Sequence, residues 1–97
     1  MTPEALALIA SYFLCSEAAE VRILSPSETE TCIATYQQVK LSFVEIGMEE
    51  FEAMSAVDRA EINRQGYAAY VDWRAAHPRL VAKMEAEAQA SLMASGF

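Results

Sequence analysis

Apolar and polar positions follow one another along this chain with the period of an α-helix almost throughout. From residue 26 to about residue 46, apolar side chains spaced three and four residues apart mark one stripe of a helix: Cys32, Tyr36, Val39, Phe43 and Ile46. No stretch keeps the two-residue alternation that is typical of a β-strand. The pattern therefore predicts an all-α protein.

The first predicted helix covers residues 3 to 21 or 23. Thr2 offers a capping hydroxyl, Pro3 occupies the first helical position, and Glu4 places an acid in the first turn. Apolar residues spread over a wide sector of this helix, so we expect it to lie centrally in the fold.

The sequence Ser25-Pro26-Ser27-Glu28 predicts the start of the second helix. The Ser25 hydroxyl can accept from the backbone N–H of Glu28, while the Glu28 carboxylate reaches back to the N–H of Ser25. Gly47 is placed to adopt the left-handed conformation that ends many helices. We expect the first and second helices to form a hairpin that turns at residue 24 or 25.

The second half of the chain continues the helical pattern. Residues 48–54 predict a short acidic turn of helix that carries Phe51 inward, and Ser55 is a weaker cap for a helix over residues 56–76. Gly66 lies in the middle of that helix at a cost of about 1 kcal/mol relative to alanine. Either another helix crosses closely at this point or the helix bends.

The pair His77-Pro78 interrupts the pattern, because proline cannot continue the hydrogen-bond ladder and disfavours helical geometry in the residue before it. A last helix then covers residues 78 to about 94 and ends at Ser95-Gly96. The alternative is one kinked, continuous helix. Together these elements predict a single domain over residues 1–97, a small bundle of three to four helices.

Composition limits the class of protein. The 97 residues are 54% hydrophobic and 22% charged, which excludes a disordered chain, and three Gly and three Pro are too few for a β-sandwich. A monomer of 10.7 kDa is expected to expose about 5,500 Å². The net charge of −7 arises wholly in residues 1–54, which hold nine acids and two bases, so we expect no direct binding of nucleic acid.

The two cysteines and the apolar run over residues 5–15 bear on the compartment. Only Glu4 precedes that run, which lacks the basic flank of a secretory leader and is too short to span a bilayer. We therefore expect a cytoplasmic protein with no membrane partner and with free thiols. The predicted hairpin places Cys15 and Cys32 within about 3 Å of the same level. Two buried thiols are the favoured interpretation, and a disulfide or redox switch is the alternative.

Groups that converge for catalysis are scarce. The chain has one histidine, His77, and no paired-cysteine, His-Glu-x-x-His or Glu-x-x-His motif, calcium loop or glycine-rich phosphate loop. We therefore predict that the protein is not an enzyme and binds no metal or cofactor.

Two sets of residues are candidates for a partner surface. The first is a run of acids that forms either a solvated edge or a docking surface for a basic partner: Glu45, Glu49, Glu50 and Glu52. The second is a group of aromatics that belongs to the core, to a protein interface or, least favoured, to a base-stacking surface: Tyr67, Tyr70 and Trp73.

Three classes of function remain open, and an enzyme is the least favoured of them. The first is a helical protein-interaction module that self-associates, most simply as a two-fold homodimer, because the apolar sectors of the first two helices are wider than one neighbouring helix covers. The alternative is an acidic inhibitor that blocks a nucleic-acid-binding complex, by analogy of size and charge with anti-defence proteins of phages and mobile elements. Association that resists salt favours the module, and salt-sensitive capture of a basic partner favours the inhibitor.

Overall fold

The computed structural model describes residues 1–95, which form five helices and no strand. The elements are α1 (Pro3–Val21), α2 (Pro26–Val44), α3 (Met48–Glu52), α4 (Ala56–Ala76) and α5 (Pro78–Ala94). The all-α prediction is confirmed, and the predicted short acidic turn is a separate helix, α3. Its Phe51 is buried, as expected. The sequence predicts that the last helix ends at Ser95-Gly96. Ser95 is the C-cap of α5, and Gly96 lies outside the described residues.

The three predicted caps are present. The Thr2 hydroxyl accepts from the N–H of Ala5 at 3.1 Å, and the Ser55 hydroxyl accepts from the N–H of Asp58 at the same distance. At the start of α2, the Glu28 N–H donates to Ser25 Oγ at 3.1 Å and the Ser25 N–H donates to Glu28 Oε1 at 2.9 Å. This reciprocal pair satisfies two backbone groups that the helix itself cannot pair.

The end of α2 differs from the prediction. Glu45, and not Gly47, adopts the left-handed conformation, with φ 55° and ψ 42°. Gly47 has φ −75° and caps the start of α3. The helix ends two residues early because α3 must turn back to bury Phe51, so tertiary packing overrides the preference of glycine for this position.

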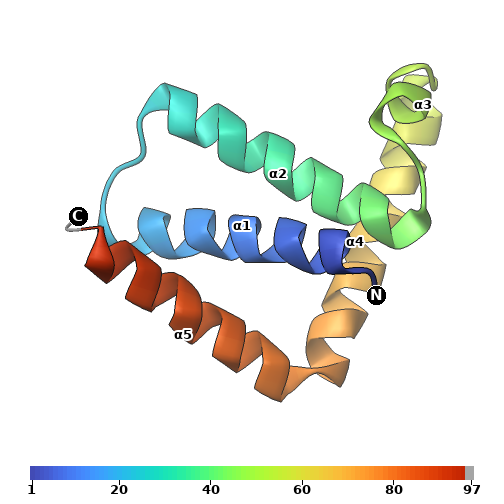
Figure 1. The fold of residues 1–97 in the computed structure, drawn as a ribbon. Helices are drawn as coiled ribbons and strands as arrows, with labels where there is room; N and C mark the ends of the chain where they lie inside the picture. Colours follow the sequence, from blue (N-terminus) through green and yellow to red (C-terminus); the bar gives the residue numbers. More distant parts are fainter. Residues whose placement is uncertain (96–97) are drawn as a thin grey trace.

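His77 separates two helices, and the alternative of one kinked helix is wrong. The residue ends α4 and precedes α5 with φ −130° and ψ 54°, outside helical geometry. Figure 1 shows α5 leaving this point in a different direction and running back along α1.

The helices form a thin layer that is closed at one end (Figure 1). α1 lies between α2 and α5, and α4 crosses the layer at the end that holds the start of α1. Figure 1 also shows the C-terminal end of α5 beside the connection between α1 and α2, at the opposite end. The main core follows this arrangement, with its buried members drawn from four helices: Ile9, Phe13, Val39, Tyr70, Val81, Met84 and Ala88.

Gly66 lies where α4 crosses α2. A Cβ atom at this position would stand 2.5 Å from the backbone oxygen of Lys40 and 2.9 Å from its carbonyl carbon. The close crossing, rather than a bend, is therefore the reason for a glycine inside this helix.

The hairpin register is confirmed, and the expectation of free thiols is wrong. Cys15 and Cys32 form a disulfide with their Cα atoms 5.7 Å apart, and no cysteine is free in the part of the chain that the structure describes. Cα separations of 4.4–6.8 Å suit a disulfide. The number of residues between each cysteine and the turn of the hairpin correctly predicts that Cys15 and Cys32 lie side by side. The expected cytoplasmic location predicts free thiols, and the disulfide contradicts that expectation.

The first two helices expose less apolar surface than their sequence predicts. α5 covers the second stripe of α1, so that Ile9 and Phe13 are buried, and on α2 the exposed large apolar residue is Ile33, at 66%. The surface area is nevertheless 6,316 Å², above the roughly 5,500 Å² typical of this mass. The radius of gyration of 14.2 Å also exceeds the roughly 12.5 Å expected for this length.

Candidate interaction surface

The three aromatic candidates separate in the fold. Tyr70 is buried in the core, Trp73 is partly buried against Phe43 and His77, and Tyr67 is 54% exposed. Tyr70 makes edge contacts with Tyr12 and Tyr36, with ring-centroid distances of 6.2 and 6.0 Å. The interpretation of these aromatics as core residues is therefore right for Tyr70 and largely right for Trp73, and Tyr67 alone stands on the surface.

Arg74 of α4 links this aromatic cluster to α1 and α5. Its Nη1 donates to the Tyr70 hydroxyl at 3.2 Å, its guanidinium lies 5.4 Å from the Phe13 ring centroid, and it lies 3.9 Å from the Glu85 carboxylate. Burial raises the pKa of the Tyr70 hydroxyl, and burial likewise raises the pKa of Tyr36 to about 12. Both tyrosines thus remain neutral, and the cluster has a structural role.

The four acidic candidates are exposed at the corner of the molecule formed by the end of α2 and by α3. None of Glu45, Glu49, Glu50 and Glu52 forms an ion pair with a residue in the described range 1–95. Within that range, no three acidic, histidine or cysteine side chains converge as a metal site would require. Among the described residues, these acids form a negative edge and are not gathered into a metal-binding cluster.

His77 is exposed and used structurally. Its Nδ1 lies 2.9 Å from the carbonyl oxygen of Trp73, and its ring stacks on the indole of Trp73 with centroids 5.4 Å apart. Among residues 1–95, no acid is hydrogen-bonded to this ring.

One side of α1 is left uncovered by the other helices. Five of its exposed residues recur at intervals of three and four and so share one stripe: Ala7, Ala10, Ser11, Leu14 and Val21. The exposed Glu4 precedes Ala7 with the same spacing, and the exposed Ala19 and Glu20 lie off the stripe. We call this stripe the open face of α1. Ala18 lies on the same stripe and is buried. In Figure 1, α1 runs between α2 and α5.

Three cavities open beside this face. One of about 160 Å³ lies between α1 and α5, lined by Ala10, Leu14 and Met84 among others. Another, of about 310 Å³, joins Leu14 to the disulfide and to Leu92 near the end of α5. The third, of about 300 Å³, lies between Leu8 of α1 and the C-terminal half of α2. The open face is therefore flanked by grooves rather than by filled packing.

The grooves have little unbalanced charge. Their charged lining residues are Arg22, Glu28 and Glu87. Arg22 pairs with Glu28 at 2.6 Å, and Glu87 pairs with Lys83 at 3.8 Å. In a chain with a net charge of −7, this surface contrasts with the acidic corner around α3.

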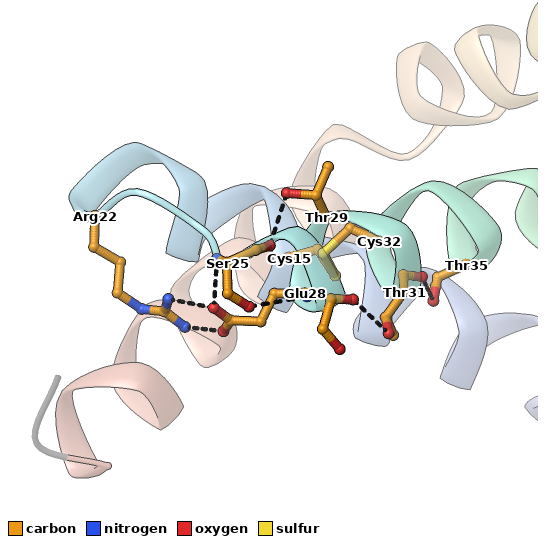
Figure 2. The surroundings of a disulfide bond; sticks show 9 residues. Cys15, Arg22, Ser25, Glu28, Thr29, Thr31, Cys32 and Thr35 are labelled. Carbon is orange, nitrogen blue, oxygen red and sulfur yellow. Dashed lines mark hydrogen bonds and ion pairs between the residues drawn. A yellow bond between two sulfur atoms is a disulfide. The ribbon is translucent and has the colours of Figure 1, made fainter.

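The disulfide closes the end of the layer that α4 does not reach (Figure 2). Cys15 and Cys32 join α1 to α2 about two turns beyond the Ser25 cap. Glu28 both completes that cap and accepts two hydrogen bonds from Arg22, at 3.0 and 2.6 Å. The pKa of the Glu28 carboxyl falls from 4.5 to about 2, chiefly through the Arg22 hydrogen bonds and then the Ser25 N–H.

Reasoning from the sequence singled out the acids and aromatics but missed the open face of α1. Alanine and serine carry a weak apolar signal, so this stripe is inconspicuous beside Leu6, Ile9 and Phe13. The signal that could have found it is the spacing of Ala7, Ser11, Leu14, Ala18 and Val21 by four, three, four and three residues, which is typical of a helix-pairing seam.

Among residues 1–95, no helix is both long and apolar enough to cross a membrane. The chain matches no protein-family model, and no curated protein and no solved structure is significantly similar to it.

Proposed function

We propose that the protein is a non-catalytic protein-interaction module that pairs with a second copy of itself through the open face of α1. The observation that carries the proposal is this uncovered stripe with its flanking grooves. Small side chains let two helix backbones approach closely, and the four–three spacing suits a helix packed along its length.

The exposed area supports a partner of ordinary size. The chain exposes about 800 Å² more than a typical monomer of its mass, and a standard protein interface buries about 800 Å² on each partner. A two-fold pair would bury the same stripe on both copies.

The paired charges along the grooves offer little attraction to a strongly basic partner at this face and little local obstacle to a second copy. Two chains of charge −7 repel one another, but the charged residues that line the grooves are already paired within each chain. The contact is therefore expected to be mainly apolar and to resist salt, because screening weakens charge–charge interactions and, between two chains of the same sign, reduces repulsion.

The test is the molar mass in solution, measured by light scattering after size exclusion at tens of micromolar. A dimer of twice 10.7 kDa, about 21 kDa, is expected at both low and high salt. Ala10→Arg places a charge in the seam and should yield the monomer. Val57→Arg is the matched control, because Val57 is 78% exposed on α4 and should leave the dimer intact. A monomer at every concentration would reject self-association.

A second candidate function rests on the acidic corner. Glu45, Glu49, Glu50 and Glu52 are exposed and unpaired among the described residues, which suits an inhibitor that occupies a basic, nucleic-acid-binding groove. Such binding would weaken steeply with salt and would be lost in Glu49→Lys/Glu50→Lys. Binding that resists both changes would exclude this mode. A cytoplasmic location remains a prediction, without the support that free thiols would have provided.

A further inference from the structure

A separate cavity of about 460 Å³ lies at the closed end of the layer, away from the open face of α1. Its lining comes from three helix ends: Met1, Thr2 and Ala5 at the start of α1, Ser42, Phe43 and Glu45 at the end of α2, and Trp73 and His77 at the end of α4. Two candidates from distant parts of the sequence, Glu45 and Trp73, thus meet in one place. The volume is within the range of small-molecule sites.

Aromatic rings form much of the wall. The Phe43 and Trp73 ring centroids are 6.3 Å apart with planes inclined by 56°, and the Trp73 and His77 rings are 5.4 Å apart. Because the Trp73 carbonyl oxygen can only accept, His77 Nδ1 donates to it. The faces of aromatic rings favour a positively charged guest.

The local charge is negative at two of the three helix ends. Glu45 supplies a carboxylate, and α2 and α4 both end here, with the partial negative charge of their last carbonyl groups. The last turn of α2 contains no basic side chain, and Arg74 of α4 is engaged with Tyr70 and Glu85. At the start of α1, Met1 also lines the cavity and carries the positively charged α-amino group, while Glu4 places an acid in the first turn of the helix.

We propose that this cavity binds a small organic ammonium cation of the quaternary, trimethylammonium type. Glu45 supplies the charge complement and the rings of Phe43 and Trp73 supply cation–π and apolar contact. The inference does not depend on self-association, because the cavity lies within one chain.

Trp73 is the only tryptophan, so its fluorescence reports directly on the cavity wall. Choline chloride is titrated at constant ionic strength, and a saturable change in emission is expected. The comparison probe is 3,3-dimethyl-1-butanol, which has the shape of choline without its charge. It should bind at least about twofold to fivefold more weakly, because exposed cation–π contacts are worth that much.

Two variants complete the experiment. Glu45→Gln should weaken choline binding by about twofold to fivefold, and Glu49→Gln, an exposed acid of α3 that does not line the cavity, should leave it unchanged. Circular dichroism melting confirms that both variants are folded. No saturable change with choline, equal binding of the neutral probe, or an unchanged affinity in folded Glu45→Gln would each overturn the proposal.

Discussion

The two ends of the helical layer are held together by different means. At the closed end, α4 crosses the layer and Tyr70 packs among Tyr12, Tyr36 and Phe43, with ring centroids 6.0 to 6.2 Å away. At the other end, α1 and α2 have no crossing helix and are joined by the Cys15–Cys32 disulfide and by the polar contacts of Glu28.

The difference shows how a chain of this size stabilises a layer that it cannot cover completely. The four long helices bury a cluster of aromatic residues at one end only. At the other end, a covalent link between α1 and α2 reduces the entropy of the unfolded chain instead. Substitutions at the two ends should therefore differ in how much they lower the free energy of unfolding and in the spectroscopic signals that they change.

The largest effect is expected for Tyr70→Ala, which should lower the free energy of unfolding by about 3–5 kcal/mol, because it leaves a cavity among four rings. Urea denaturation measures this change. The neighbouring Val71→Ala is the control, since Val71 is 41% exposed and should lose less than about 1 kcal/mol. Similar losses in the two variants would mean that the aromatic cluster does not dominate the closed end.

The next effect concerns the open end. Replacing both cysteines, Cys15→Ser with Cys32→Ser, should cost about 3 kcal/mol, since the disulfide closes a loop of 17 residues. Hydrogen exchange should accelerate in the first turns of α2, while the near-ultraviolet signal of Trp73 stays unchanged. A loss of the Trp73 signal under native conditions would show that the two ends unfold together.

The crossing of α2 and α4 is tested by Gly66→Ala. Its Cβ would overlap the Lys40 carbonyl, so a loss of about 2 kcal/mol is expected, even though alanine favours a helix by about 1 kcal/mol. Gly47→Ala is the control, because no atom lies within 4 Å of a Cβ at that position and its φ is −75°. Increased thermal stability in Gly66→Ala would contradict the close crossing.

A smaller loss is expected for Ser25→Ala, about 1 kcal/mol, since it removes the acceptor for the Glu28 N–H. The thermal midpoint of the oxidised protein is the measurement. Ser27→Ala is the matched control, because the Ser27 side chain caps no backbone group in the described structure. An unchanged midpoint in Ser25→Ala would mean that the disulfide alone holds the start of α2.

The smallest effect is the pH dependence of the Arg22–Glu28 contact. The folded pKa of Glu28 is about 2, below its usual 4.5, so its stabilising contribution is complete above pH 4.5 and is lost as the pH falls towards 2. The native protein should therefore lose more stability between pH 6 and pH 3 than Glu28→Gln does. Glu61, which has a similarly low pKa, is present in both proteins and cancels in the comparison. Parallel pH profiles would contradict the shift, which solvent exposure keeps small.

Local signals predicted the helices well, because caps and proline positions depend on neighbouring residues. Thr2, Ser25 and Ser55 cap their helices as predicted, and Pro78 begins α5. The prediction failed at Gly47, where the need to bury Phe51 outweighs a local preference. Of the candidate partner residues, the acids were placed on the surface correctly, whereas Tyr70 belongs to the core, because helical spacing alone does not identify which stripe another helix covers.

The sequence by itself determined the helical class, the helix starts and the level of Cys15 with Cys32, since each depends on spacing along one or two adjoining segments. Only the tertiary structure decided that α5 covers α1, that Gly66 meets Lys40, and that Glu45 and Trp73 share a cavity. These features depend on the angles at which whole helices pack. Such angles follow from the summed contacts of many side chains, and no single segment of the sequence specifies them.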